Sequence, residues 1–200
     1  MKIVIVSKTR MGNAVCIGAL CVDSGRSLRL RPPGYQGFPQ NIGFKVGEIW
    51  EIELDRAEID FDPPHIEDVF VSSYRRIGLE RNLSQFIEQR LPPLRGDIAG
   101  LFNGLIKFTN NGRGYISRVG IPNSSTGFWI PGQQLALTSD QKHYRYGTTF
   151  RELVYVGLET PRSVLDAGTL IRVSLARWWR PLDAPESEER CYVQLSGYIE

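Results

Sequence analysis

The spacing of short apolar runs limits the folds open to this sequence more than any other feature. These runs are separated by segments rich in Gly, Pro, Asn and Asp, which are typical of turns. Residues 48–54 alternate acidic and apolar side chains, which indicates a half-buried strand with a carboxylate face. Short strands at this spacing are typical of an all-β barrel or sandwich. Within the first 75 residues we predict five strands, at residues 3–6, 14–23, 27–31, 48–54 and 67–73.

One amphipathic helix is predicted after these strands. Apolar residues recur at helical spacing over residues 79–91, and a Pro-Pro pair ends the pattern. Residues 97–106 suggest a short helical turn. The second half returns to strand patterns, predicted at residues 114–119, 127–130, 142–146, 153–158, 170–178 and 191–198.

A faint internal repeat connects the two halves. Residues 47–56 and 168–177 each begin with Gly, carry Leu seven residues later and carry Arg two residues after that. Each segment is followed by a proline-containing loop and a final strand. We interpret the repeat as two barrels, the first over residues 1–75 and the second over residues 111–200, with a helical bridge over residues 76–110.

Composition excludes several classes of protein. No apolar stretch approaches the ~20 residues that a membrane-spanning helix requires. The N-terminus runs directly into a strand pattern without the features of a signal peptide. We therefore expect a cytoplasmic protein with no membrane contact. Cys16, Cys21 and Cys191 form neither a metal-binding motif nor a disulfide framework, so we expect buried thiols and neither a metal nor another cofactor.

Charge is distributed unevenly along the chain. The net charge is only +2, but residues 1–40 carry six cations and one acidic residue, while residues 45–70 carry two cations and nine acidic residues. Residues 71–120 are basic again, with eight cations and three acidic residues. We expect the acidic block at residues 48–68 to neutralise arginines. The cations are mostly Arg, which suits bidentate phosphate contacts and stacking on flat rings, although a GC-rich genome also favours Arg.

Separate segments of the chain together resemble one protein family. They are residues 7–11 (Ser-Lys-Thr-Arg-Met), 63–69 (Pro-Pro-His-Ile-Glu-Asp-Val), 178–181 (Trp-Trp-Arg-Pro) and 194–197 (Gln-Leu-Ser-Gly). With these segments the chain resembles, over nearly its whole length, the dual OB-containing domain, a bacterial family of two tandem OB-type barrels. The resemblance implies a nucleic-acid role and brings no established reaction or catalytic residues. The expected fold is all-β, with two tandem OB-like barrels of five to six strands and a minor helical bridge.

The first candidate site is the turn after the first strand, which contains Lys8, Thr9, Arg10 and Met11. In an OB barrel the loop between strands 1 and 2 borders the ligand face. Lys8 and Arg10 can grip a phosphate on either side of Thr9, and Met11 can pack against a base. The alternative is that Lys8 and Arg10 pair with the acidic block and anchor the first strand.

A second candidate site follows on the chain. Arg29 and Arg31 lie two residues apart on one strand and therefore share a face. Together with Arg26, and with Tyr35 and Phe38 in the following loop, they place cations among aromatic rings, an arrangement that holds single-stranded nucleic acid. The alternative is a solvated basic face.

His65 is the third candidate, because Glu67 and Asp68 follow it closely. A histidine beside two carboxylates can ligate a metal or transfer a proton. The second histidine is far away in the sequence, and there is no obvious nucleophile partner. A turn whose carboxylates pair with nearby arginines is therefore the favoured interpretation.

Trp178, Trp179 and Arg180 form the fourth candidate. Adjacent indoles at the end of a strand point to opposite faces, so at most one belongs to the core. The other can stack on a base or fill the contact between the barrels, and the second role is favoured. The glycines of residues 110–114 can cradle a phosphate, but a plain turn is the simpler interpretation.

These candidates predict a binding module for nucleic acid or a nucleotide, not an enzyme. It would contact phosphates and the bases of single-stranded DNA or RNA through the first barrel. Two alternatives stay open. One is an enzyme that acts on nucleic acid or a nucleotide with His65, Glu67 and Asp68. The other is a protein–protein adaptor whose acidic strand binds a basic partner.

Overall fold

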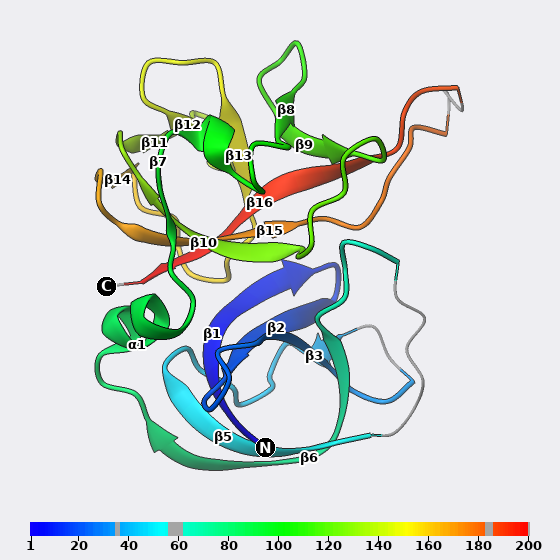
Figure 1. Ribbon diagram of the computed structural model, residues 1–200, viewed down its shortest axis with the longest axis vertical. Helices are drawn as coiled ribbons and strands as arrows, with labels where there is room; N and C mark the ends of the chain where they lie inside the picture. Colours follow the sequence, from blue (N-terminus) through cyan, green and yellow to red (C-terminus); the bar gives the residue numbers. More distant parts are fainter. Residues whose placement is uncertain (35–36, 56–61, 183–185, 200) are drawn as a thin grey trace.

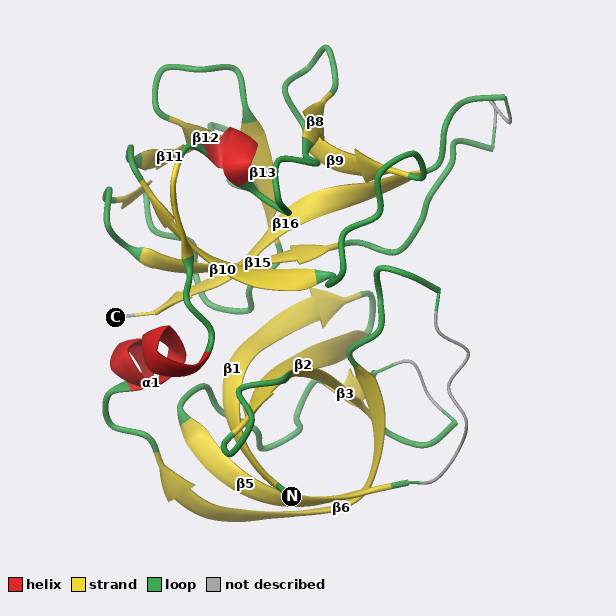
Figure 2. Cartoon of the chain, in the orientation of Figure 1, coloured by secondary structure: helices red, strands yellow, loops and turns green. Residues whose placement is uncertain are grey.

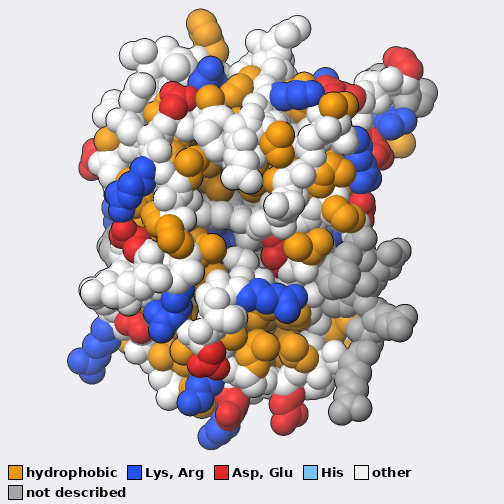
Figure 3. Space-filling model, viewed as in Figure 1, with side chains coloured by type: hydrophobic (Ala, Val, Ile, Leu, Met, Phe, Trp, Pro, Cys, Tyr) orange, Lys and Arg blue, Asp and Glu red, His pale blue; other side chains and the backbone are white. Residues whose placement is uncertain are grey.

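The computed structural model describes residues 1–34, 37–55, 62–182 and 186–199, and it folds into two β-barrels stacked one on the other (Figures 1 and 2). On one face a hollow lies along the boundary between the barrels (Figure 3). The strands and helices of the first half are β1 (Lys2–Met11), β2 (Ala14–Cys21), β3 (Ser27–Arg31), β4 (Phe38–Pro39), β5 (Glu48–Leu54), β6 (Asp68–Leu79) and α1 (Leu83–Arg90). Those of the second half are β7 (Leu94–Gly96), η1 (Ile98–Gly100), β8 (Lys107–Phe108), β9 (Gly114–Ser117), β10 (Thr126–Pro131), β11 (Leu135–Leu137), β12 (His143–Tyr146), β13 (Glu152–Tyr155), β14 (Val164–Leu165), β15 (Leu170–Leu175) and β16 (Arg190–Ile199).

The first barrel is a closed sheet in the order β1-β2-β3-β6-β5, with β5 returning to β1. β3 and β6 run parallel, and the other neighbours in the ring run antiparallel. This is the five-stranded Greek-key order of an OB fold. Period-2 alternation sends Ile3, Ile5, Val15 and Ile17 into its core. The sheet continues to Leu79, beyond the expected end of the first barrel at residue 75.

The second barrel repeats this order. β10 and β11 act as one bent first strand, since β10 pairs with β15 and β11 pairs with β12. The ring continues through β13, which runs parallel to β16, and β16 pairs with β15. The predicted all-β fold of two tandem OB barrels is therefore confirmed. The repeated segments fall on β5 and β15, which occupy the same place in the two rings.

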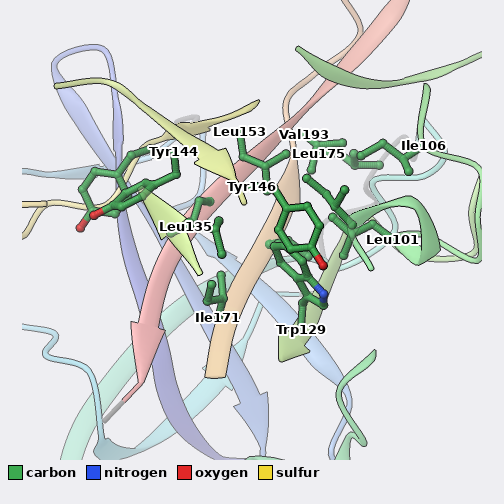
Figure 4. Close-up of a cluster of buried hydrophobic side chains, with 14 of the residues drawn as sticks. Leu101, Ile106, Trp129, Leu135, Tyr144, Tyr146, Leu153, Ile171, Leu175 and Val193 are labelled. Carbon is green, nitrogen blue, oxygen red and sulfur yellow. The ribbon is translucent and has the colours of Figure 1, made fainter. Parts of the chain in front are cut away.

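Large aromatic side chains fill the second barrel (Figure 4). Trp129, Tyr144 and Tyr146 are completely or almost completely buried there. The polar tips have partners. The indole of Trp129 donates to the carbonyl of Gly96 at 3.0 Å, and the hydroxyl of Tyr144 donates to the carbonyl of Arg162 at 2.7 Å. The hydroxyl of Tyr146 also donates to the carbonyl of Gly96, at 3.5 Å. All three rings are core residues whose polar tips are hydrogen-bonded.

A third apolar cluster joins the barrels. Outward-facing side chains of β1 and β2 meet side chains of β10, β15, β16 and α1, and the buried members are Val4, Val6, Leu20, Leu83, Phe86, Ile87, Phe128, Ile130, Leu170 and Ile199. The helix begins at Leu83 and not at residue 79, because Leu79 is paired with Glu48 at the end of β6. Asn82 caps it by accepting a hydrogen bond from the backbone of Gln85. The helix therefore packs against both barrels where they meet.

Backbone hydrogen bonds add to this joint. The amide of Arg10 donates to the carbonyl of Val156 at 2.9 Å, and the amide of Leu158 donates to that of Lys8 at 3.3 Å. Thr9 and Gly157 therefore form a β-bridge between the barrels. The end of β1 is consequently held by the second barrel.

The charged centre of the joint is Asp68, whose side chain is 2% exposed. Its carboxylate pairs with Arg29 and with Arg31 (3.0 Å) of the first barrel and with Arg177 (2.6 Å) of the second. Burial alone would raise the pKa of the Asp68 carboxyl, but the bonds and charges of Arg29 and Arg177 outweigh it and lower the pKa. One buried carboxylate thus balances cations from both barrels.

Neighbouring polar groups complete this joint. The carboxylate of Glu67 accepts hydrogen bonds from the hydroxyl of Ser124 (2.7 Å) and from the amide (2.6 Å) and hydroxyl (2.7 Å) of Ser125. His65 is 1% exposed, and its Nε2 lies 3.7 Å from the Sγ of Cys191. Burial, followed by the charges of Arg29 and Arg177, lowers the pKa of His65 to about 4. The ring is therefore neutral in the folded protein at neutral pH.

The acidic block neutralises arginines, as predicted. Besides Asp68, its pairs are Glu48 with Arg76 (2.8 Å), Glu51 with Arg75 (2.5 Å) and Asp62 with Arg118 (2.9 Å).

Replacing Asp68 with Ala is expected to lower the free energy of unfolding by about 3–5 kcal/mol, because three arginines would lose their shared buried partner. Chemical denaturation with a constant m-value measures the change. Glu51→Ala is the matched control, because the Glu51–Arg75 pair is exposed and its loss should leave stability almost unchanged. Equal losses in both variants would contradict the central role of Asp68.

Stability is also expected to fall as the pH drops from 6.5 to about 4. The unfolded chain binds a proton at His65 near its ordinary pKa, whereas the folded chain resists protonation until about pH 4. Protonation therefore favours the unfolded chain in this window, by up to about 3 kcal/mol.

Unfolding measured across the window for wild type and His65→Asn tests this expectation. The variant should lose most of the pH dependence, and His143→Asn should retain it. An unchanged slope in His65→Asn would contradict the assignment.

Candidate nucleic-acid interface

The ligand face of an OB barrel is the outer side of its second and third strands, bordered by the loops between strands 1 and 2 and strands 4 and 5. In the second barrel these are β12 and β13, with the loop at residues 138–142 and the described residues 176–182 and 186–189 between β15 and β16. A cavity of about 440 Å³ opens at this place. Its lining includes Arg113, His143, Glu152, Val154, Arg177, Trp178, Trp179, Tyr192 and Gln194.

Trp178 forms a fixed wall of this cavity. Its indole Nε1 donates to the carbonyl of Pro63 at 2.7 Å, across the boundary between the barrels. The guanidinium of Arg118 lies over the ring at 3.9 Å from its centroid. Trp178 therefore contacts the first barrel, as the sequence suggested for one of the two indoles.

Trp179 is the more accessible ring of the pair. It is 50% exposed, and its ring centroid lies 6.1 Å from that of Tyr192. Its backbone is bonded in both directions to Arg190, so the loop is held where the ring lines the cavity. An exposed indole on a fixed backbone is a platform on which a flat ring can stack.

Cations and polar groups surround the rings. Arg113 is exposed and makes no ion pair with any carboxylate in the described parts of the chain. The guanidinium of Arg177 lies between the cavity and Asp68. Glu152 is paired with Arg145 at 2.8 Å, and the Nδ1 of His143 lies 2.6 Å from Asp140. The cavity thus offers stacking surfaces, cations and hydrogen-bonding groups together.

The corresponding face of the first barrel is covered by the second barrel. Arg172 of β15 is 5% exposed, and burial lowers its pKa to about 10. It packs on β2, where a Cβ added to Gly18 would lie 2.7 Å from a guanidinium nitrogen of Arg172. Arg29 and Arg31, expected to contact phosphate on this face, pair with Asp68 instead. The two side chains are only 16% and 18% exposed, so most of their surface is occupied by protein contacts.

Lys8, Thr9, Arg10 and Met11 do not form the expected turn, because β1 continues to Met11 and these four residues pair with residues 14–17 of β2. The ammonium of Lys8 donates to the carbonyl of Ile42 at 2.6 Å, and burial lowers the pKa of Lys8. Thr9 is buried at the joint, and the Cε of Met11 packs beside Gly37. Arg10 is exposed. Neither Lys8 nor Arg10 pairs with the acidic block within the described ranges. Their backbone groups, not their side chains, anchor the end of β1, through hydrogen bonds to Leu158 and Val156 of the second barrel.

The remaining candidates are scattered. Arg26 is exposed on the turn between β2 and β3, and Arg180 is exposed beyond Trp179. Tyr35 lies outside the described residues. His65, Glu67 and Asp68 are buried. Asp68 pairs with arginines, as the turn interpretation expected, whereas Glu67 bonds to Ser124 and Ser125. No group of three His, Cys, Asp or Glu residues that could hold a metal is found in the described part of the chain.

Sequence reasoning did not single out several lining residues. Along β16, Tyr192 and Gln194 point outward into the cavity, whereas the alternate residues Cys191 and Val193 point into the core. This period-2 alternation in the last strand was a usable signal. Arg113 was recognised only as part of a glycine-containing turn, because its nearness to Trp179 depends on the tertiary fold.

None of the helices in the described residues is long and apolar enough to span a membrane. No curated protein and no solved structure matches the sequence. The family model for the dual OB-containing domain matches residues 1–198. The family's two OB barrels correspond to the closed first sheet and to the second sheet described above, and the family suggests an OB-type binding module. The chain belongs to the dual OB-containing domain family.

Proposed function

We propose that the protein binds single-stranded nucleic acid in the cavity of the second barrel. The observation that carries this proposal is the grouping of Trp178, Trp179 and Tyr192 with Arg113 at the place where OB barrels bind oligonucleotides. Aromatic rings beside cations suit single strands, because every base has a face that can stack and every nucleotide carries a phosphate.

The roles of the lining residues follow from their surroundings. Trp179 offers the accessible stacking face, while Trp178 is fixed by its bond to Pro63 and closes the cavity on the side of the first barrel. Arg113 has no carboxylate partner among the described residues, so it is available for phosphate. Gln194 and His143 present polar atoms suited to base edges.

This proposal moves the contact from the first barrel to the second. The face that carries Arg29 and Arg31 is covered, and the ammonium of Lys8 is bonded to a carbonyl. Arg10 keeps its proposed role as a phosphate contact, because its side chain is exposed beside the second barrel. The neutral, buried His65 and the fully bonded Glu67 and Asp68 favour binding over catalysis.

Trp179→Ala is expected to weaken binding of a labelled strand of about 12 nucleotides by roughly tenfold or more, since base stacking contributes about 1–3 kcal/mol. Fluorescence anisotropy with DNA and RNA strands measures the affinity. Phe150→Ala is the control, because Phe150 is 84% exposed but does not line the cavity. A Trp179 variant that binds like wild type would contradict the proposal.

Salt titration distinguishes phosphate contacts from structural cations. Arg113→Ala and Arg10→Ala should each flatten the slope of log affinity against log salt by about 0.7, the value for one phosphate contact on a single strand. Arg75→Ala, which removes an exposed cation on β6, should leave the slope unchanged. An unchanged slope in the Arg113 variant would remove phosphate binding from this cavity, and the same result for Arg10 would remove β1 from the interface.

A further inference from the structure

A second and larger cavity, of about 630 Å³, lies between the two barrels on another part of the surface. Its walls come from residues 24–27, 66–67, 90–94, 100–103 and 122–128, so both barrels and the segment between them contribute. The hollow at the boundary of the barrels is visible in Figure 3, with Lys and Arg side chains at its edges. Its volume is in the range of small-molecule sites.

The edge of this cavity is positively charged. Arg26 is exposed and makes no ion pair with the described residues. Arg90 lies over the ring of Phe86 at 3.9 Å, and its Nε donates to the carbonyl of Val22 at 2.8 Å, again without a carboxylate partner in the described ranges. Glu67 is the acidic residue in the lining, and Ser124 and Ser125 already occupy both its oxygens. An anion would therefore be attracted to the two arginines.

The interior differs from the edge, because apolar side chains dominate it. Leu91, Leu94, Leu101, Phe102 and Phe128 supply surfaces suited to a flat ring.

Polar groups interrupt the apolar walls at a few points. Asn103 and Asn123 carry amides, whose donor and acceptor match the edge of a base. The hydroxyl of Thr126 is buried, with no hydrogen-bond partner in the described structure.

The backbone of one wall is unusual. Phe102 and Asn103 have φ angles of 53° and 60°, so two successive residues with side chains adopt the left-handed conformation. This conformation is unfavourable for a bulky residue and persists only where the surrounding structure holds it, as often at ligand sites.

We propose that this cavity binds a nucleoside monophosphate, with the base between the apolar walls and the phosphate at Arg26 and Arg90. A sugar phosphate would leave the apolar walls unused, and an apolar ligand would leave the arginines unused. The inference does not rest on the proposed function, since the two cavities share no lining residue. A ligand here would contact both barrels and stabilise their arrangement.

Isothermal titration calorimetry of the full chain with AMP, GMP, CMP and UMP tests the proposal, with the matching nucleosides and inorganic phosphate as comparisons. At least one monophosphate is expected to bind and to raise the melting temperature. Its nucleoside should bind about tenfold more weakly or worse, because it lacks the charge-assisted bonds to arginine. Absence of binding by all four monophosphates, or equal binding of nucleoside and monophosphate, would overturn the proposal.

Variants locate the site. Arg26→Ala should weaken monophosphate binding by about tenfold, while Arg81→Ala, at an exposed arginine outside the cavity, should leave it unchanged. Wild-type affinity in the Arg26 variant would overturn the proposal.

The two sites can fail separately. Trp179→Ala should leave monophosphate binding intact, and Arg26→Ala should leave oligonucleotide binding intact. If Trp179→Ala abolishes monophosphate binding, the nucleotide occupies the second-barrel cavity, and the present proposal is wrong while the proposed function stands. If inorganic phosphate competes as well as the nucleotide does, the base is not recognised and the proposal is likewise wrong.

Discussion

The buried carboxylate of Asp68 holds arginines from both barrels at one point, and the rest of the structure is arranged around it. Arg29 and Arg31 lie on β3, while Arg177 follows β15. A lone buried carboxylate would be unfavourable, and so would these cations packed together without it. Two of the ion pairs join β3 to β6 within the first barrel, and the third, between Asp68 and Arg177, joins this pair of strands to the second barrel. The apolar cluster around α1 adds buried area to this contact, but apolar packing constrains the orientation of the barrels less than ion pairs with fixed geometry do.

The same OB face serves different purposes in the two barrels. In the first barrel Gly18 leaves room for Arg172, so the outer side of β2 and β3 becomes a contact with β15. In the second barrel the outer side of β12 and β13 retains an open cavity with Trp179 at its edge. The segments on which the family resemblance rests largely meet at this joint, through Thr9, His65 and Trp178. These segments therefore serve the contact between the barrels as well as any ligand binding.

Local pattern was sufficient for the strands at residues 27–31 and 48–54, which the structure places at the same bounds. Alternation over these residues fits no other element. The helix start was wrong because Leu79 fits both a helical pattern and the end of β6, and strand pairing decided between them. Trp178 and Trp179 were found from their order on the chain. The burial of Arg29 was not, because its partner depends on how β3 and β6 pair and on a second barrel far along the sequence.

The wide sequence separation between the partners at the joint has a consequence during synthesis of the chain. The strands of the first barrel are complete once Leu79 has been made, whereas Ser125, Arg172 and Arg177 emerge much later. Until then the outer face of β2 and β3 has no cover. The joint carries Arg29, Arg31 and Asp68 beside the apolar side chains of the third cluster. Charges on an uncovered sheet disfavour the aggregation to which apolar sheets are prone. A partly charged joint should therefore make an incomplete chain less prone to associate with other nascent chains than a wholly apolar joint would.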